Sequence, residues 1–363
     1  MSMADFTQAL VLTGGGTGGH FFPAVALAEG ARARWANRPI VFVGARRGIE
    51  ARRLPDGPWP HLLLDVEGFL GRSPVRAARS VWKLWRAVAD LKRRWRHQRP
   101  WAVIGTGGYG AAPALLAARS LGIPYFLHES NAAPGALVRL VAPRAARVWC
   151  GMGEAAALLR GADCLTVGTP VRAAFLRPFR PASGLQPPFR LLVLGGSGGA
   201  RAINEALLDL AAPLLEGHPD WEILHQAGAA EFERLQGRPR HPRHALVPFL
   251  ERMDEVMEAS ALVIGRAGAS TCAELLAVGR GALLVPLPSS AHDHQLMNAR
   301  ALAAQGRAEV VPQGEDLAGR LLARCRQLMD EPSALAGLSR SPEPNRSVTA
   351  CLDDLAGVLE DPA

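Results

Sequence analysis

The sequence from Val263 to Leu302, VIGRAGASTCAELLAVGRGALLVPLPSSAHDHQLMNARAL, contains the clearest fold signal of the chain. An apolar run ends in a glycine-bearing turn, a helical segment follows, and a second apolar run stops at Pro286 before a polar loop enters another helix. Strands that alternate with helices in this way are typical of a parallel sheet. We therefore predict an α/β protein.

The same stretch carries polar residues suited to a phosphorylated ligand. Gly268, Ser270 and Thr271 stand at the predicted helix start, where backbone N–H groups attract an anion. Arg266 precedes the turn and adds a positive charge for phosphate, and Glu274 follows one turn later, within reach of two sugar hydroxyls. The polar loop adds Asp293, His294, Gln295 and Asn298. Together these residues predict half of a site for a sugar nucleotide.

Composition narrows the class of protein. The 363 residues suffice for two domains, and the net charge of +8 favours an anionic partner, whether nucleic acid, a phosphorylated substrate or acidic lipid. The five cysteines form no CxxC motif, so we expect neither a disulfide framework nor a zinc site, and a reducing cytoplasm fits. Because a glycine-rich motif lies so near the N-terminus, we expect no signal peptide. No apolar run approaches the roughly 20 residues of a membrane span, so we expect any membrane contact to be peripheral.

A Rossmann-type unit opens the chain. The apolar run Ala9–Leu12 leads into the turn Gly14–His20 and the helical segment Phe22–Arg34, and the turn matches GxGxxG. The next predicted strand, Ile40–Gly44, is followed by arginines and by no acidic residue before Glu50. Since bound NAD needs an acid there for its ribose, NAD is disfavoured, whereas NADP stays open.

The segment 73–99 combines tryptophan with many basic residues, and we expect one long helix. Its apolar residues recur at helical spacing: Val81, Trp82, Trp85, Val88, Leu91 and Trp95. They either pack a crossover helix on the sheet or rest, with the arginines around them, on an anionic membrane surface. Both interpretations can hold, because the pattern is wide enough for two faces. The expected membrane contacts are Trp82, Trp85 and Arg86.

Two further predicted strands of this half also end in candidate ligand-binding turns. Ala102–Gly105 precedes a glycine turn that includes Tyr109, and Ile123–Leu127 precedes the polar cluster His128–Asn131. In open parallel sheets, ligands bind beyond the carboxyl ends of strands. The first half is therefore expected to have a ligand cleft of its own.

The opening pattern recurs after a proline-rich segment. The strand Arg190–Leu194, a glycine turn and a helix from Ala200 start a second Rossmann-like half. We therefore expect a first domain over residues 1–172, a semi-rigid linker over 173–189 and a second domain over 190–340. Apolar residues at helical spacing predict a last helix within 341–363.

Several motifs in order and spacing resemble the MurG family of bacterial glycosyltransferases, within glycosyltransferase family 28. They are GGTGGH, GTGGY, HESN, GTPVR, GGSGGAR, and RAGASTCAE with DHQLMNA. The resemblance implies a GT-B fold, in which two Rossmann-like parallel-sheet domains face each other across an interdomain cleft. Acceptor and membrane contacts would lie in the first domain and UDP-GlcNAc in the second, and the C-terminal helix would return to the first.

The resemblance also implies a reaction. GlcNAc would pass from UDP-GlcNAc to the C4 hydroxyl of MurNAc in undecaprenyl-pyrophosphoryl-MurNAc-pentapeptide (lipid I), giving lipid II for peptidoglycan at the cytoplasmic face of the cell membrane. Its donor contacts fall on Thr17, Gly18, Gly19, Asn131, Arg172, Ser197, Leu250, Ala269, Ser270, Thr271, Cys272, Ala273, Glu274 and Gln295. The acceptor pyrophosphate is expected near Gly15, Gly16, Gly107, Gly108 and Tyr109. Ser130, Thr169, Gly198 and Ala267 depart from the family's usual motifs, but none of these departures removes a charge or a candidate base.

His20 and Glu274 are the candidate catalytic residues. An α-linked donor that gives a β-linked product indicates one displacement with inversion, which needs a base, and histidine titrates near neutrality. His20 would be that base or a positioning group, and Glu274 would hold sugar hydroxyls. No DxD motif occurs, so we expect no metal. Helix N-termini, with Arg172 and Arg266, would stabilise the departing UDP instead.

Other functions stay open on the sequence alone. GxGxxG with Arg46 and Arg47 would suit an NADP-dependent oxidoreductase, and another GT-B enzyme would make a different glycolipid or epimerise the nucleotide sugar. A non-catalytic basic adaptor would use only the arginine-rich helix. Nucleic acid is disfavoured because the basic cluster is confined to that helix. The expected partners are UDP-GlcNAc, lipid I, an anionic membrane surface and proteins of cell-wall synthesis.

Overall fold

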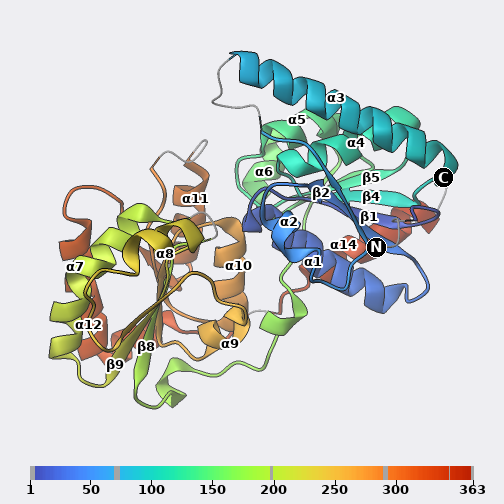
Figure 1. Cartoon of the computed structure of the whole chain (residues 1–363). Helices are drawn as coiled ribbons and strands as arrows, with labels where there is room; N and C mark the ends of the chain where they lie inside the picture. Colours follow the sequence, from blue (N-terminus) through green and yellow to red (C-terminus); the bar gives the residue numbers. More distant parts are fainter. Residues whose placement is uncertain (1–4, 69–73, 197–198, 289–292, 343, 361–363) are drawn as a thin grey trace. The chain divides into compact units, whose positions relative to one another are not determined.

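A computed structural model describes residues 5–68, 74–196, 199–288, 293–342 and 344–360. The chain forms two compact units (Figure 1). The first comprises Met1–Arg172 and Asn345–Ala363, and the second comprises Ala173–Pro344. Each unit is built on a parallel sheet, so the prediction of two Rossmann-like α/β domains is confirmed.

The sheet of the first unit has seven strands in the order β3-β2-β1-β4-β5-β6-β7. Their bounds are β1 Leu10–Thr13, β2 Ile40–Ala45, β3 His61–Leu64, β4 Ala102–Gly105, β5 Tyr125–Glu129, β6 Arg147–Cys150 and β7 Cys164–Thr166. Every residue of β1, β2, β4 and β5 is buried. These strands are near-continuous apolar runs because helices cover both faces of the sheet.

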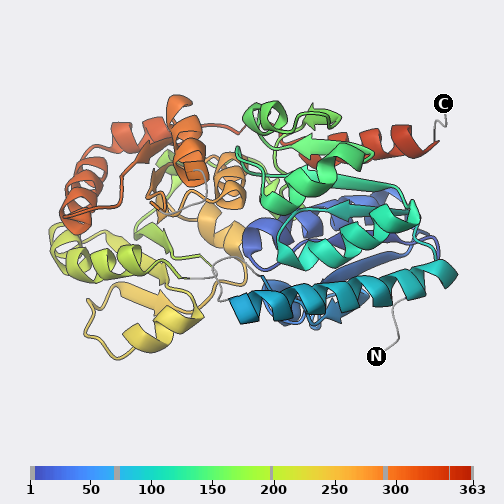
Figure 2. The same ribbon diagram turned by 90° about the horizontal axis from the view of Figure 1, so that it is seen from above.

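Successive residues of β1 pack into two different hydrophobic cores. Val11 of β1 packs in a core with residues of α3 (Pro74–His97), α4 (Ala112–Leu121), α5 (Ala136–Val141) and α6 (Gly153–Leu158). Its neighbour Leu12 packs in another core with α1 (Gly18–Arg34), α2 (Ile49–Arg53) and α14 (Ser347–Glu360). Successive strand residues point to opposite faces. Accordingly, Figure 2 shows α3 and the red C-terminal helix on opposite sides of this unit.

The C-terminal helix α14 completes the first unit. It packs on α1 at Gly30, where a Cβ atom would lie 2.3 Å from Cγ1 of Val348. Only glycine allows this close approach. Trp149 Nε1 donates to Asp354 Oδ2 at 2.8 Å, and Arg147 forms an ion pair with the same carboxylate at 3.1 Å. The end of the chain therefore holds β6 as well as α1.

The second unit has a parallel sheet of six strands in the order β10-β9-β8-β11-β12-β13. Their bounds are β8 Phe189–Leu194, β9 Trp221–Gln226, β10 His244–Val247, β11 Leu262–Gly265, β12 Ala282–Leu284 and β13 Ala308–Val310. The helices are α7 Arg201–Gly217, α8 Ala229–Leu235, α9 Met253–Glu258, α10 Ala269–Val278, α11 His294–Ala304, α12 Leu317–Asp330 and α13 Pro332–Leu338. Leu191 and Val193 pack against α7 and α12 on one face.

The proline-rich segment 173–189 belongs to the second unit. Arg177 forms ion pairs with Asp254 at 2.6 Å and Glu255 at 3.5 Å, and Arg180 pairs with Glu258 at 3.3 Å. These contacts fasten the segment to α9. The expected linker is therefore part of the folded second unit, and the chain returns to the first unit at residue 345 instead of 341.

Candidate active site

Two glycine turns of the first unit interlock. One joins β1 to α1 (residues 14–17), and the other follows β4 (residues 106–108). Gly15 N donates to Gly107 O at 3.4 Å, and a Cβ atom on Gly108 would lie 2.0 Å from Gly15 O. Gly107 and Gly108 have φ angles of 94° and 78°. Glycine is required here both for the backbone conformation and for the close approach.

His20 lies where the two turns meet. It is the third residue of α1, and its Nδ1 atom is 3.2 Å from Thr17 Oγ1. A Cβ atom on Gly107 would lie 2.9 Å from Cδ2 and 3.2 Å from Nε2 of His20, so the imidazole packs on the second turn. Thr106 Oγ1 donates to the His20 carbonyl at 2.6 Å. The half-buried ring is therefore positioned by both turns.

Tyr109 packs on the first turn. A Cβ atom on Gly16 would lie 2.7 Å from Cε1 of Tyr109, and the Tyr109 hydroxyl donates to Arg47 O at 2.8 Å. The structure thus brings together all the residues predicted for the acceptor side, namely Gly15, Gly16, Gly107, Gly108 and Tyr109, and places His20 among them.

The carboxylate of Glu50 adjoins this cluster, and sequence reasoning missed its role. Glu50 is 0% exposed. Its Oε1 accepts from Gly16 N at 3.1 Å and Ala45 N at 3.2 Å, and its Oε2 accepts from Gly16 N at 2.9 Å. Burial raises the pKa of Glu50, whereas the bonds from these backbone groups act in the opposite direction. In the sequence, Glu50 is marked only by its place in Gly48-Ile49-Glu50, where an acidic residue directly follows an apolar one.

Hydrogen bonds within the polar cluster at the end of β5 hold its side chains in place. Glu129 Oε1 accepts from the backbone N–H and the side-chain amide of Asn131, at 2.9 and 3.0 Å. His128 is buried, its Nε2–H donates to Gly168 O at 3.0 Å, and its Nδ1 therefore accepts from Ser130 Oγ at 3.2 Å. Burial lowers the pKa of His128 to about 4. Glu129 thus orients the predicted donor contact Asn131, while His128 is a neutral structural group.

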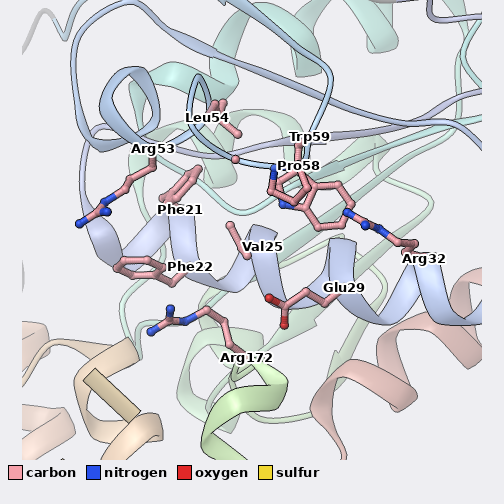
Figure 3. A pocket seen from close by; sticks show the side chains of 11 residues that line it. Phe21, Phe22, Val25, Glu29, Arg32, Arg53, Leu54, Pro58, Trp59 and Arg172 are labelled. Atoms are coloured by element: carbon pink, nitrogen blue, oxygen red, sulfur yellow. The ribbon is translucent and has the colours of Figure 1, made fainter. Parts of the chain in front are cut away.

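Arg172, another predicted donor contact, lines a hollow of about 460 Å³ beside α1 (Figure 3). The lining residues are Phe21, Phe22, Val25, Glu29, Arg32, Arg53, Leu54, Gly57, Pro58, Trp59 and Arg172. The Cζ atom of Arg172 is 4.5 Å from the centre of the Phe22 ring, a cation–π contact. Since Phe22 is two residues beyond His20, this contact anchors the Arg172 side chain to the helix that carries His20.

The start of α10 has the form expected of an anion-binding helix end. Gly268 is the N-cap residue, so no N-cap side chain bonds to the first turn. Ala269, Cys272 and Ala273 are buried, and burial raises the pKa of the Cys272 thiol to about 12. This thiol is therefore inert at neutral pH. Among the residues predicted here, Ser270, Thr271 and Glu274 keep partly exposed side chains.

Arg266 and Gln295 brace the loops beside α10. Arg266 Nη1 donates to Val285 O at 3.0 Å, and its Nη2 donates to Gln313 Oε1 at 2.7 Å. Gln295 Oε1 accepts from Leu287 N at 3.1 Å. Both side chains thus hold the segment after β12, a role that the sequence did not reveal.

The glycine turn after β8 is described only in part. Ser197, a predicted donor contact, lies outside the described residues. In α7, which follows the turn, Asn204 Nδ2 donates to Ala227 O at 3.1 Å, and Asn204 Oδ1 accepts from His225 Nε2 at 3.0 Å. Burial lowers the pKa of His225 to about 3. The predicted donor contact Leu250 follows β10 and is half-buried.

The predicted stripe of α3 divides between two faces. Leu91 and Trp95 are 0% exposed and belong to the core, whereas Trp82 and Trp85 are 54% and 69% exposed. The guanidinium of Arg86 lies 4.7 Å from the Trp82 ring centre. The idea that the whole stripe packs on the sheet is therefore wrong for its first turns.

In the part of the chain that the structure covers, no three His, Cys, Asp or Glu side chains gather closely enough to hold a metal ion. Among the described helices, none is both long and apolar enough to cross a membrane.

Two family models match the chain. The glycosyltransferase family 28 N-terminal domain matches residues 10–150, and the family 28 C-terminal domain matches residues 190–349. The chain belongs to glycosyltransferase family 28. The resemblance found in the motifs is confirmed, and the enzyme class is that of a glycosyltransferase.

Named family relatives extend over most of the chain. The UDP-N-acetylglucosamine–N-acetylmuramyl-(pentapeptide) pyrophosphoryl-undecaprenol N-acetylglucosamine transferase of Syntrophotalea carbinolica is 42% identical over 308 residues, 84% of this chain and 85% of that protein. The crystal structure of Acinetobacter baumannii MurG matches with a TM-score of 0.68 at 28% identity, over 95% of this chain and 98% of that one. A putative UDP-N-acetylglucosamine 2-epimerase from Listeria monocytogenes has a TM-score of 0.69 at 13% identity, over 99% and 97%. At 13% identity, this match shows only that the two chains share a fold.

Proposed function

We propose that this family 28 enzyme transfers GlcNAc from UDP-GlcNAc to the C4 hydroxyl of MurNAc in lipid I and so makes lipid II for peptidoglycan. The observation that carries the proposal is the 42% identity to the Syntrophotalea carbinolica transferase over 84% of the chain. That relative's name states the sugar transferred and the pyrophosphoryl-undecaprenol acceptor. The cluster of His20 with the two glycine turns supports it, because α1 begins there and a helix N-terminus attracts a pyrophosphate.

His20 is the proposed base for the attacking hydroxyl. We assign the Nδ1 proton to the 3.2 Å bond with Thr17 Oγ1, which places the basic electron pair on Nε2. Nε2 adjoins Gly107, on the turn proposed to hold the acceptor pyrophosphate. The base and the acceptor would therefore meet at the same turn, as general base catalysis requires.

Each unit carries proposed donor contacts. In the first unit these are Thr17, Gly18, Gly19, Asn131 and Arg172; in the second they are Ser197, Leu250, Arg266, Gln295 and residues 269–274. The N-terminus of α10 supports binding of the diphosphate, because its first backbone N–H groups carry partial positive charge. Glu274 would accept hydrogen bonds from sugar hydroxyls. Arg266 would act through the loop it braces, since two of its guanidinium nitrogens already bond there.

The reaction is proposed to need no metal ion. Departing UDP would be stabilised by the α10 N-terminus and by Arg172, both preorganised in the folded chain. Turnover that persists in excess EDTA would support this proposal, and restoration of activity by added Mg²⁺ or Mn²⁺ would contradict it.

The enzyme is proposed to act as a peripheral protein at the cytoplasmic face of the cell membrane. Exposed Trp82 and Trp85, with Arg86 beside them, would dock α3 on anionic lipid, where tryptophan and arginine are both favourable. Proteins of cell-wall synthesis are proposed as neighbours there, and nucleic acid is not expected as a partner.

A second GT-B activity is the main alternative. The shared fold with the Listeria epimerase would fit epimerisation of UDP-GlcNAc, and a glycolipid synthase would use diacylglycerol. Family 28 membership argues against an NADP-dependent oxidoreductase.

Product analysis separates these activities. The purified enzyme is given UDP-GlcNAc with a soluble lipid I analogue, with diacylglycerol, or without acceptor. We expect a β-1,4-linked GlcNAc–MurNAc product only with the lipid I analogue. An epimerised nucleotide sugar without acceptor, or a glycosylated diacylglycerol, would refute the proposal.

A further inference from the structure

The carboxylate of Glu50 is enclosed by glycine backbone. Cβ atoms on Gly15, Gly44, Gly48 and Gly110 would lie 2.3, 2.9, 2.7 and 2.9 Å from side-chain atoms of Glu50. Contacts this short leave no room for another side chain. The four glycines therefore form a cage that fits one carboxylate, and they come from three separate segments of the sequence.

The cage joins the segments that build the candidate active site. Through Gly16 N, Glu50 holds the turn after β1, and through Ala45 N it holds the end of β2. Gly110 lies one residue beyond Tyr109, so the same carboxylate contacts the segment after β4. One side chain thus fixes the spacing of three segments.

The chemistry of the group argues against simple space filling. An apolar side chain could fill a buried space at no electrostatic cost, whereas a buried carboxylate is costly. Burial raises the pKa of Glu50. A carboxylate is retained at such a place because it accepts bonds from backbone N–H groups that would otherwise be buried without acceptors.

We propose that Glu50 is a positioning residue for the transfer reaction: it sets the turn of Gly15 and Gly16 against the turn of Gly107 and Gly108, and so fixes where His20 meets the acceptor. The effect reaches His20 by two routes. Along the chain, His20 lies four residues after Gly16, in the first turn of α1. In space, its ring packs on Gly107. This inference rests on the proposed function.

Glu50→Gln tests the inference with the least change in volume. Oε1 serves both Gly16 N and Ala45 N, while Oε2 serves Gly16 N alone. An amide has one acceptor oxygen, so in either orientation its NH₂ group would face a backbone N–H. The two turns would have to move apart slightly, although the cage remains filled.

Kinetics and hydrogen exchange are measured for wild type, Glu50→Gln and the exposed-site control Glu154→Gln. We expect Glu50→Gln to lower kcat about 10- to 100-fold, the scale of small misplacements in a site. The KM for UDP-GlcNAc should rise less than kcat falls, since most of the proposed donor contacts lie outside this turn. Backbone amides of residues 14–20 and 106–110 should exchange faster, and the control should match wild type in every measurement.

Several outcomes overturn the inference. A kcat of Glu50→Gln within about twofold of the wild-type value would overturn it. Unchanged hydrogen exchange in both turns would also overturn it. So would a loss of kcat that is fully explained by the fraction of unfolded protein. If Glu50→Gln does not fold, Glu50→Asp replaces it, with the carboxylate one methylene short, and the same split between kcat and KM is expected at smaller size.

The proposed function can fail separately. Absence of acceptor-dependent turnover in the wild type would refute the transfer reaction. Hydrogen exchange needs no substrate, so it would still show whether Glu50 holds the two turns together.

Discussion

Single residues around the first glycine turn set the proposed chemistry. In the proposed mechanism the bond between Thr17 and His20 Nδ1 leaves Nε2 as the base, and Thr106 holds the His20 backbone. These contacts give His20 a defined orientation before any substrate arrives. Preorganisation of this kind is what makes a base effective at a fixed distance.

Replacement of His20 should therefore affect the chemical step. His20→Ala is expected to lower kcat on the order of 10²-fold or more, the usual scale for a general base. Thr17→Val should lower kcat by about fivefold, because it removes one oriented hydrogen bond of roughly 1 kcal/mol, and Thr17→Ser should restore it. Steady-state kinetics measure all three. Equal kcat values for His20→Ala and wild type would exclude the base role.

Gly108 offers a test of the interlocked turns. Gly108→Ala should destabilise the protein more than Gly122→Ala, although both glycines have positive φ angles, 78° and 61°. A Cβ atom on Gly108 meets Gly15 O, whereas nothing lies within 4 Å of one on Gly122. The shared backbone cost is about 1–2 kcal/mol, and the clash adds to it only at Gly108. Urea unfolding measures the difference, and equal losses would contradict the described packing.

The helix α3 has one face for the core and another for solvent. Its inner face is fixed by Trp95 and by the buried Lys83, which pairs with Asp65 and Glu67 at 3.0 Å each. These ion pairs tie the helix to the segment after β3. The orientation of the exposed tryptophans therefore follows from contacts on the opposite face.

The two faces should respond differently to the same substitution. Trp82→Ala with Trp85→Ala is expected to weaken binding to vesicles containing anionic lipid while leaving the melting temperature unchanged. Trp95→Ala should instead lower the free energy of unfolding by about 3–5 kcal/mol, because it empties a core site. Vesicle sedimentation measures the first effect, and thermal unfolding measures the stability of both variants. Undiminished vesicle binding by the double variant would reject α3 as the docking surface.

Central elements could be predicted from the sequence, and edge elements could not. The bounds of β4 match the predicted run Ala102–Gly105, and those of β8 differ by one residue from the predicted Arg190–Leu194, because apolar runs mark strands buried within a parallel sheet. The strands β3 and β13 were not predicted. They lie at sheet edges, are short and are only partly buried, so their sequences carry little apolar signal.

Local site features were likewise easier to predict than distant ones. Residues in and beside the glycine turns could be proposed from the sequence because a turn and the helix after it are contiguous. The acceptor role of Glu50 and the bonds of Arg266 depend on which carbonyl or N–H group the fold brings near. Hydrogen bonds of this kind leave no periodic pattern in the sequence.

For the whole molecule, buried neutral histidines predict sensitivity to acid. Burial lowers the pKa of His128 to about 4 and that of His244 also to about 4. Between about pH 6.5 and 4 the unfolded chain binds protons that the folded chain does not, so stability is lost as pH falls through that window.

His128→Gln should make the first unit less sensitive to this fall in pH. The amide can still donate to Gly168 O, and the variant lacks the group that titrates. Between pH 7 and pH 4, the free energy of unfolding of His128→Gln should fall by about 3 kcal/mol less than that of wild type. Urea unfolding across this range measures it, with the exposed-site variant His97→Gln as control. A pH dependence identical to wild type would contradict the assignment of a neutral, buried His128.

The measurement that tests the central claim most directly is release of UDP from UDP-GlcNAc, with and without a soluble lipid I analogue, in excess EDTA. We predict that the wild-type enzyme releases UDP only when the analogue is present and that EDTA does not slow it. Release that is independent of the analogue, or no release with it, would contradict the account of this chain as the transferase that makes lipid II.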